Sequence, residues 1–425
     1  MARVLGSELR GLTYLIDEPS LGLHPDDTES LGQILTSLAR RGENVLCVEN
    51  NLALARHAEV VCALGPGAGK EGGRVLSMQP GAALPSVQSI EEVPASRGSN
   101  GTLHLRSVRA HNLREVSLAL PLGCIVAVCG ASGSGKSTLL FDVVVPLLQV
   151  LRRRPKPGEL KRALEMSSTT GASLDGIVSR VISARRLVAA TVDGTVASSL
   201  GVLEPLAQLY AAIPAAQAAG VTARDFARRS ARSRCDRCVG ATADRCPQCR
   251  GTRYAAFLSQ YRYRGRSIAE MGALEIRELA ELLLRIPPIA SPLTAAMRLG
   301  LGYLRLSQGL RTLSLGELHR VRLARVLVSG LRTNGVAILD EPGAGLPGGE
   351  QALVMREMRS FTERGNSIVF IEHSATMIAR ADHVIELGPG GGSLGGSVIA
   401  TGTPQEIARN PNSRIARHLQ VSECG

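Results

Sequence analysis

The sequence contains no long apolar run, and this absence restricts where the protein can function. No stretch of about 18 or more uninterrupted apolar residues occurs, which argues against a membrane-spanning helix. The first residues, MARVLGSELRG, lack an apolar core before a small-residue cleavage site, so we expect no signal peptide. Both absences predict a cytoplasmic protein without membrane contact.

Lysine is also scarce. Arginine carries nearly all of the positive charge, because only four lysines occur, at Lys70, Lys136, Lys156 and Lys161. The formal net charge is +12, which favours an anionic partner without identifying it. Hydrophobic residues make up 44% and charged residues 20% of the 425 positions. This composition excludes a wholly disordered chain and is typical of two or three globular domains.

An internal repeat organises the chain. YLIDEPSLGLHP around Asp17 resembles AILDEPGAGLPG around Asp340, and these aspartates lie 323 positions apart. The same offset aligns Glu49 with Glu372 without a gap, and 18 of the 57 pairs from Asp17 onward are identical. The sequence therefore predicts two copies of one unit.

Each copy has the pattern of an α/β unit. Short apolar runs that end in acidic residues, such as TYLID, NVLCVE, VAILD and SIVFIE, are typical of buried parallel strands, and they alternate with helical stretches. The two copies differ in what precedes them. Some 240 residues with a complete phosphate-binding motif lie between the linker and Asp340, whereas only 16 residues precede Asp17. We therefore expect the first copy to lack a nucleotide loop of its own.

Residues 130–137, GASGSGKS, fit the G-x-x-x-x-G-K-[ST] phosphate loop between an apolar run and a helical one. Its glycines let backbone N–H groups converge on phosphate oxygens at a helix N-terminus. We expect Lys136 to reach the β- and γ-phosphates of ATP and Ser137 to ligate Mg²⁺. The predicted ATP-binding residues here are Gly130, Gly133, Gly135, Lys136, Ser137 and Thr138.

Acidic and histidine side chains follow the strands of the second copy. Asp340 ends the run VAIL and is predicted to hold Mg²⁺, while Glu341 is predicted to orient or deprotonate the attacking water. His373 ends the run SIVFIE and is predicted to contact the γ-phosphate. Asn50 takes its place in the first copy, so that copy cannot use histidine chemistry.

The segment LSLGE at residues 313–317 precedes a helical run. Ser314 with Glu317 three residues later predicts a helix-capping box. Ser314 and Gly316 would present this helix N-terminus to a γ-phosphate. The order of phosphate loop, LSxGE, Asp-Glu and His is that of ATP-binding-cassette (ABC) enzymes.

Four of the nine cysteines form two C-x-x-C pairs, Cys235 with Cys238 and Cys246 with Cys249. This spacing predicts one tetrahedral Zn²⁺ in a reduced protein, with a redox pair as the alternative. No histidine or water-activating carboxylate completes an open coordination site, so we expect the metal to be structural.

A basic segment surrounds these cysteines. Residues 221–266 contain 12 arginines and three aspartates. Arginine on a zinc-pinned loop favours phosphate contacts with duplex DNA, with little sequence preference; a solvated basic face is the alternative. The predicted DNA contacts are Arg250, Arg253, Arg262, Arg264 and Arg266.

These features together resemble the UvrA family, the damage-sensing ABC-type ATPase of bacterial nucleotide excision repair. The resemblance rests on the C-x-x-C pairs between phosphate loop and LSxGE, and on the ending ELGPGGGSLGG. It implies an α/β fold: an ABC-type P-loop NTPase cassette with a zinc-binding insertion, preceded by the C-terminal half of another cassette. The predicted boundaries are 1–77 for that half, 78–102 for a linker, 103–150 with 290–425 for the second cassette, and 151–289 for the insertion.

The chain departs from the family in several places. Leu315 replaces the third-position glycine of the signature, SARRLVAATVDG replaces a family segment that contains glutamine, and Gly343-Ala344 replaces the hydroxyl after Asp-Glu-Pro. The zinc hairpin is short, and the first phosphate loop and the UvrB-binding region are absent. Either the chain is a degenerate paralogue, or its front is encoded upstream of Met1.

These departures leave two functions open. One is an ATP- and DNA-binding protein of excision repair that uses ATP, Mg²⁺ and Zn²⁺, with impaired hydrolysis. The other is a non-hydrolysing regulatory or DNA-protective module. A membrane-transporter ATPase is disfavoured by the zinc insertion. The expected partners are duplex DNA and either a second copy or a separately encoded front half.

Overall fold

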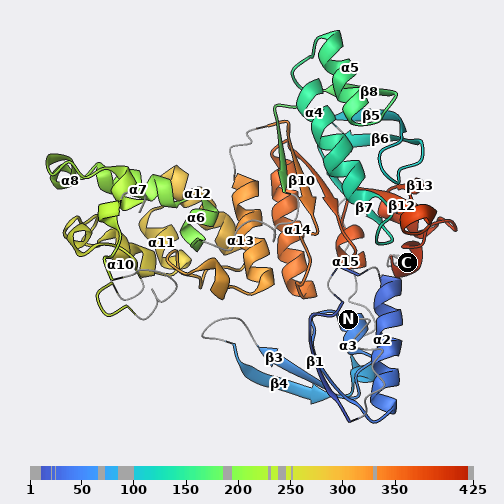
Figure 1. The fold of residues 1–425 in the computed structure, drawn as a ribbon, viewed down its shortest axis with the longest axis horizontal. Helices are drawn as coiled ribbons and strands as arrows, with labels where there is room; N and C mark the ends of the chain where they lie inside the picture. Colours follow the sequence, from blue (N-terminus) through green and yellow to red (C-terminus); the bar gives the residue numbers. More distant parts are fainter. Residues whose placement is uncertain are drawn as a thin grey trace. The chain divides into compact units, whose positions relative to one another are not determined.

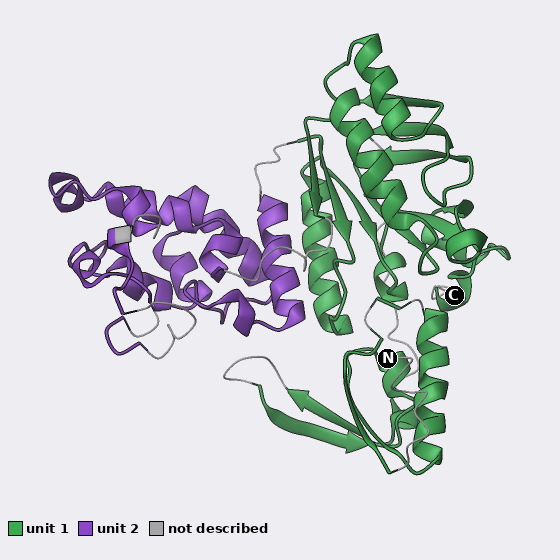
Figure 2. Ribbon diagram, viewed as in Figure 1, with its two compact units in different colours: residues 1–186, 331–425 green, residues 187–330 purple. Residues whose placement is uncertain are grey.

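The computed structural model describes residues 11–20, 22–23, 25–65, 72–84, 100–184, 194–227, 231–237, 246–249, 252–328 and 333–419. The chain divides into two units (Figure 2). Unit 1 comprises residues 1–186 and 331–425, and unit 2 comprises residues 187–330. No described helix is long and apolar enough to cross a membrane.

A six-stranded sheet organises unit 1, with the strand order β13-β12-β7-β11-β10-β9 (Figure 1). All neighbours are parallel except β12 and β13, which are antiparallel. All described residues of β7 and β11 are buried, as expected for parallel strands covered on both faces. The strands are β7 (Ile125–Gly130), β9 (Arg180–Ala184), β10 (Gly335–Asp340), β11 (Ser367–Ile371), β12 (His383–Gly388) and β13 (Ser397–Gly402).

Helices and a second sheet complete this cassette. A π-helical segment, Thr138–Val144, follows the phosphate loop and continues into α4 (Val145–Leu151). Its leucines and valines share one core with side chains of β7, β10, β11 and β12. The remaining helices are α5 (Pro157–Met166), α14 (Gly348–Glu363), α15 (Ala375–Ile378) and α16 (Pro404–Ala408). The antiparallel sheet has the order β6-β5-β8 and is formed by β5 (Gly101–Val108), β6 (Val116–Leu122) and β8 (Gly171–Gly176).

The predicted insertion, 151–289, differs from the division seen in the structure. Residues 171–176 form β8, which pairs with β5 (Gly101–Val108), and β9 joins the central sheet. Unit 2 instead runs from 187 to 330 and takes in the LSLGE helix. The predicted linker, 78–102, contains the end of β4 (Arg74–Gln79) and the start of β5, and its residues 85–99 lie outside the described ranges.

The first repeat copy reproduces the elements of the second at the 323-residue offset. Its elements are β1 (Thr13–Asp17), α2 (Pro25–Arg40), β2 (Asn44–Val48), α3 (Leu52–Ala55), β3 (Val61–Gly65) and β4. Helix α2 matches α14 residue for residue, and β2 matches β11 in the same way. Strands β1 and β2 are parallel, whereas β3 and β4 form an antiparallel hairpin.

Burial distinguishes the two copies. The sequence predicts buried strands in both, and this is wrong for one face of β1 and β2. Their residues alternate, because Leu31, Leu35 and Leu38 of α2 pack on one face only. Leu15 and Leu46, on the other face, are 74% and 63% exposed.

Unit 2 is helical. Its longest helices are α12 (Pro287–Arg298) and α13 (Leu315–Val328), which pack together. Unit 2 also contains an aromatic cluster, in which the ring of Phe226 contacts Tyr210 and Tyr261. The shorter helices are α6 (Val196–Leu200), α7 (Leu203–Ala211), α8 (Pro214–Ala218), α9 (Ala223–Phe226), α10 (Ile268–Ala273) and α11 (Ile276–Leu282).

Candidate nucleotide-binding site

The phosphate loop lies in the strand–loop–helix context that its sequence predicts, between β7 and the π-helical segment. Three of its glycines adopt positive φ: 128° at Gly130, 75° at Gly133 and 101° at Gly135. A Cβ atom at Gly130 would lie 1.9 Å from the carbonyl oxygen of Leu387. Glycine is therefore required here both by backbone conformation and by space.

Lys136 is the buried cation of this loop, with 6% of its surface exposed. Its Nζ donates to the carbonyl oxygens of Gly130 and Ala131, both at 2.8 Å. Burial lowers the pKa of Lys136 from its ordinary value, and the carboxylates of Glu341 and Asp340 oppose this shift. An ammonium group held within a glycine loop fits the phosphates of a nucleotide.

The predicted catalytic side chains meet at the ends of β10 and β11. Glu341 follows β10, and its Oε1 lies 3.4 Å from Nε2 of His373, which follows β11. The N–H of Glu341 donates to the carbonyl oxygen of Ile371 at 3.0 Å, and its φ is 48°. Asp340 is the last residue of β10. The structure thus brings Asp340, Glu341, His373 and the Lys136 loop together within unit 1.

Glu372 organises this site, although sequence analysis assigns it no role beyond its place in the repeat. Its carboxylate accepts from the N–H groups of His373 at 2.8 Å, Ser374 at 3.2 Å and Gly343 at 3.0 Å. Burial raises the pKa of the Glu372 carboxyl, while the hydrogen bond from His373 lowers it. Glu372 therefore fixes the loops that carry His373 and the residues after Glu341.

The first copy contains the same arrangement. The carboxylate of Glu49 accepts from the N–H groups of Ser20, Asn50 and Asn51, the counterparts of the three donors around Glu372. Glu18, the counterpart of Glu341, also has positive φ, at 44°. Both copies of the repeat have glutamate at this position, as Glu49 and Glu372. This identity was the sequence feature that could have indicated a shared structural role.

A glycine-rich loop after β12 supports the phosphate loop, a second feature that the sequence left without a function. The N–H of Gly392 donates to the carbonyl oxygen of Gly133 at 3.0 Å. Asn112 donates its Nδ2 to the same oxygen at 2.8 Å. A Cβ at Gly391 would lie 2.3 Å from the carbonyl oxygen of Ser132. The GPGxG segment therefore needs glycine here, because its backbone packs directly against the backbone of the phosphate loop.

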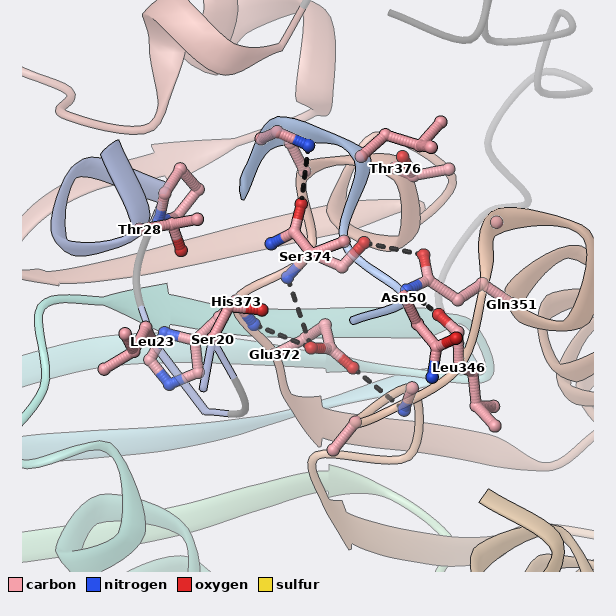
Figure 3. A pocket seen from close by; sticks show the side chains of 18 of the residues that line it. Ser20, Leu23, Thr28, Asn50, Leu346, Gln351, Glu372, His373, Ser374 and Thr376 are labelled. Atoms are coloured by element: carbon pink, nitrogen blue, oxygen red, sulfur yellow. Dashed lines mark hydrogen bonds between the residues drawn. The ribbon is translucent and has the colours of Figure 1, made fainter. Parts of the chain in front are cut away.

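A cavity of about 420 Å³ opens beside this site (Figure 3). Its walls come from the loops after β1 and β2 in the first copy and after β10 and β11 in the second. Nδ2 of Asn50 donates to the carbonyl oxygen of Gly345, and Oγ of Ser374 donates to Gln351. The walls include Glu372 and His373 but no residue of the phosphate loop.

The LSLGE segment lies in unit 2, at the start of α13. The predicted capping box is present: the N–H of Ser314 donates to Glu317 at 2.7 Å, and the N–H of Glu317 donates to Oγ of Ser314 at 3.2 Å. Ser314 is exposed, Leu315 is half-buried and Gly316 is buried. The helix N-terminus is therefore accessible at Ser314.

Three of the four predicted metal ligands form a buried cluster. The Sγ atoms of Cys235, Cys246 and Cys249 all lie within 4.8 Å of one another, and those of Cys235 and Cys246 are 3.8 Å apart. Cys238 lies outside the described residues. Tetrahedral Zn²⁺ with Zn–S bonds of about 2.3 Å requires sulfur separations of about 3.8 Å. The cluster fits such an ion.

The predicted DNA-binding arginines are exposed wherever the structure describes them, but two make local contacts. Arg262 forms an ion pair with Glu270 at 3.1 Å, and Nη1 of Arg264 donates to the carbonyl oxygen of Leu282. Arg253 and Arg266 are exposed. Arg250 is not among the described residues.

The chain is similar to UvrA proteins in both sequence and structure. UvrABC system protein A from Haemophilus influenzae is 34% identical over 450 aligned positions, which take in 99% of this chain and 47% of that protein. The protein of that name from Escherichia coli K12 is 33% identical, with the same shares covered. UvrA2 from Deinococcus radiodurans matches with a TM-score of 0.81 and 32% identity, over 98% of this chain and 52% of that structure.

More distant structures share the fold alone. Ribosome-bound archaeal Pelota and ABCE1 gives a TM-score of 0.52 at 18% identity. No model of a protein family matches the chain. The chain spans about half the length of the curated relatives it matches. Across that span the chain agrees with these relatives in sequence and in fold, and it is similar to the UvrA family.

Proposed function

We propose that this protein binds ATP and duplex DNA as a UvrA-like cytoplasmic component of nucleotide excision repair. The observation that carries the proposal is the site around Lys136. A buried lysine within a glycine loop lies beside Glu341 and Asp340, in a chain similar to the UvrA family. Loop, lysine and carboxylates are the parts that phosphoryl-transfer enzymes use to hold a nucleotide.

Each residue takes a separate role in this proposal. The loop glycines and Thr138 hold the phosphates through backbone and hydroxyl groups, and Lys136 contacts the β- and γ-phosphates. Ser137 and Asp340 hold Mg²⁺, which neutralises phosphate charge when bound. Glu341 accepts a proton from the attacking water. His373, positioned by Glu372, contacts the γ-phosphate.

In this proposal, the γ-phosphate of the bound ATP is also contacted by a second protein surface, opposite the phosphate loop. We propose that Ser314 and Gly316 of another molecule supply it, as a helix N-terminus favours anions. Ser314 is accessible at the start of α13. A homodimer of second cassettes is therefore one proposed assembly, and association with a separately encoded front half is another.

We further propose that Cys235, Cys238, Cys246 and Cys249 hold a structural Zn²⁺. The buried thiols of the three described cysteines have suitable spacing. Because the ion would tie residues 235 and 249 together, it would fix the backbone around Arg253, whose carbonyl accepts from the N–H of Cys235 at 3.0 Å.

DNA binding is tested by fluorescence anisotropy with a labelled duplex at several salt concentrations. Because each phosphate contact contributes a slope of about −0.9 to the dependence of log affinity on log salt, replacing both Arg253 and Arg266 by Ala should make that slope shallower by about two. Arg153→Ala, an exposed arginine outside the segment, is the matched control. Binding that is absent or insensitive to salt would reject the DNA part of the proposal.

A further inference from the structure

One carboxylate of the first copy is bound by two basic side chains of the second cassette. Asp26, in the first turn of α2, forms ion pairs with both Arg417 and His418. Its Oδ1 atom lies 2.8 Å from Nε2 of His418, and its Oδ2 atom contacts Nη2 of Arg417. The side chains of Asp26 and His418 are 24% and 29% exposed, so their contact is partly shielded from water. These three residues are here called the clamp.

The repeat indicates that Asp26 is not needed to form its helix. Helix α14 matches α2 residue for residue, and the counterpart of Asp26 is Gly349. A Cβ atom at Gly349 would meet no atom within 4 Å, so space does not exclude a side chain there. Asp27 and its counterpart Glu350 are both acidic and lie in the first turn, where a negative charge suits the helix dipole. Asp26 is therefore distinguished by its contact with the second cassette.

The two basic side chains lie on a turn that is fixed to the second cassette. This turn, Ala416–His418, is flanked by Ile415 and Leu419, which are both buried. Glu386 of β12 is fully buried, and its carboxylate accepts from Oγ of Ser413 at 2.5 Å and from the N–H of Ile415 at 3.2 Å. Because the backbone of the turn is held in this way, the clamp fixes the start of α2 relative to the second cassette.

The loop that leads into α2 reaches the predicted catalytic glutamate. Gly22 has a φ of 71°, and a Cβ atom there would lie 3.4 Å from Oε2 of Glu341. The N–H of Leu23 donates to the carbonyl oxygen of Ser20 at 3.1 Å, which closes this loop as a β-turn. The other oxygen of Glu341, Oε1, lies 3.4 Å from Nε2 of His373. Each oxygen of the Glu341 carboxylate thus has a defined neighbour.

The position of this β-turn relative to Glu341 depends on contacts between the two copies. Leu23 packs against the leucines of α2, in a core cluster separate from the one that contains side chains of β7, β10 and β11. One contact between the copies is neutral, from Nδ2 of Asn50 to the carbonyl oxygen of Gly345 at 3.1 Å. Hydrogen bonds between charged groups are roughly twice as strong as neutral ones. The clamp is therefore the stronger of these two contacts.

We propose that Asp26 is a positioning residue for the phosphoryl chemistry of the second cassette. Through Arg417 and His418, it holds the β-turn that contains Gly22 against the carboxylate of Glu341. This contact keeps that carboxylate in one orientation for the attacking water, and such placement of a reacting group lowers the barrier of a reaction. The inference rests on the role proposed above for Glu341 and adds a residue of the first copy to that site.

Hydrogen exchange and steady-state hydrolysis of Asp26→Ala, in the full chain and at equal protein concentration, test the proposal. Loss of the clamp should raise amide exchange at least tenfold in peptides that contain Leu23 or Ala344, whose N–H groups are hydrogen-bonded in the two facing loops. The kcat for ATP should fall at least fivefold. KM should change less than twofold, because the phosphate loop is untouched. Asp26→Glu, which keeps the carboxylate, should restore both quantities.

Two further variants separate the clamp from a general effect on α2. Glu29→Ala removes an ion pair with His57, at 3.0 Å, that lies on the same helix but within the first copy, and it should change neither exchange nor kcat. Arg417→Gln combined with His418→Gln should reproduce the effects of Asp26→Ala. Adding Asp26→Ala to that double variant should have no further effect, because the three side chains act as one unit.

Three outcomes would overturn the proposal: unchanged exchange in Asp26→Ala, faster exchange with unaltered kcat, or the same effects from Glu29→Ala. Mg-ATP affinity is measured by calorimetry on the same preparations. Wild-type protein that does not hydrolyse ATP would reject the role of Glu341 and this inference together. Wild-type hydrolysis that Asp26→Ala leaves unchanged would reject this inference and leave the proposed function standing.

Discussion

At the scale of single residues, the two copies give an internal comparison of catalytic groups. Glu341 and Glu18 share their position in the repeat and a left-handed backbone, with φ of 48° and 44°. Glu341 lies near Lys136 and His373, whereas Glu18 contacts Asn50. The two glutamates therefore differ in their surroundings, and we expect them to differ in function for that reason.

Glu341→Gln should abolish whatever ATP hydrolysis the protein performs and leave Mg-ATP binding unchanged. An amide cannot accept the proton from the attacking water, but it keeps the size of the side chain. Phosphate release and nucleotide affinity are measured on the same sample. Glu18→Gln is the matched control and should leave phosphate release unaltered. A Glu341→Gln variant that hydrolyses ATP at the wild-type rate would remove Glu341 from the chemistry.

At the scale of residues, sequence analysis could identify candidate site residues that belong to known motifs. The phosphate loop, Asp340, Glu341, His373 and the Ser314 cap are recognised by spacing and local context. Glu372 was not assigned a role, because its three bonds are to backbone groups that come from two separated loops. Arg262 was predicted to contact DNA, and composition does not reveal its ion pair with Glu270, which lies eight positions later in α10.

At the scale of elements, the repeat predicted two copies of one strand and helix pattern, and the structure shows equivalent elements in both copies. The prediction that the strands of both copies are buried is wrong for one face of β1 and β2. Leu15 and Leu46 are as apolar as residues of a fully buried strand, so their exposure cannot be read from the sequence. The predicted start of the insertion, at residue 151, also differs from the start of unit 2, at residue 187. Strands β8 and β9 follow α5 within the predicted insertion but complete cassette sheets through pairing with distant residues.

The cysteine cluster is the element whose stability should depend on metal. Purified protein should contain close to one Zn²⁺ per chain, and Cys235→Ser should lose it, because removing one of four thiolates opens the site. Metal analysis measures the zinc content, and hydrogen exchange over residues 231–237 and 252–260 measures the stability of the backbone around the cluster. Cys62→Ser, at an exposed cysteine away from the cluster, is the control. Metal-free protein from a chelator-free preparation would refute the zinc assignment.

Nucleotide binding should survive the loss of this metal. The cluster belongs to unit 2 and the phosphate loop to unit 1. Each unit has its own core, so local unfolding around residue 235 leaves the loop after β7 in place.

At the scale of the whole molecule, we propose that catalysis depends on assembly more than on the residues of one cassette. The second copy carries the phosphate loop, Asp340 and His373, and the first copy carries no phosphate loop among the described residues. Because stabilisation of charge on the transferring phosphoryl group dominates this chemistry, we propose that a helix N-terminus from another molecule completes the site.

Turnover per molecule should therefore rise with protein concentration. At low concentration the chain should bind ATP but release phosphate slowly, and turnover should increase as Ser314 of one molecule meets the nucleotide of another. Leu315→Gly should raise the rate further, because it removes a branched side chain from that helix N-terminus. Steady-state assays over a hundredfold range of concentration measure both effects. Brisk hydrolysis that is independent of concentration would contradict this requirement.

Equilibrium binding of Mg-ATP tests the central claim most directly. Isothermal titration calorimetry compares the wild type with Lys136→Ala and with Lys161→Ala, another of the four lysines and one outside the loop. We predict one ATP bound per chain in the wild type and in Lys161→Ala, and no detectable binding in Lys136→Ala. ATP binding that persists unchanged in Lys136→Ala, or is absent from the folded wild-type protein, would contradict the account.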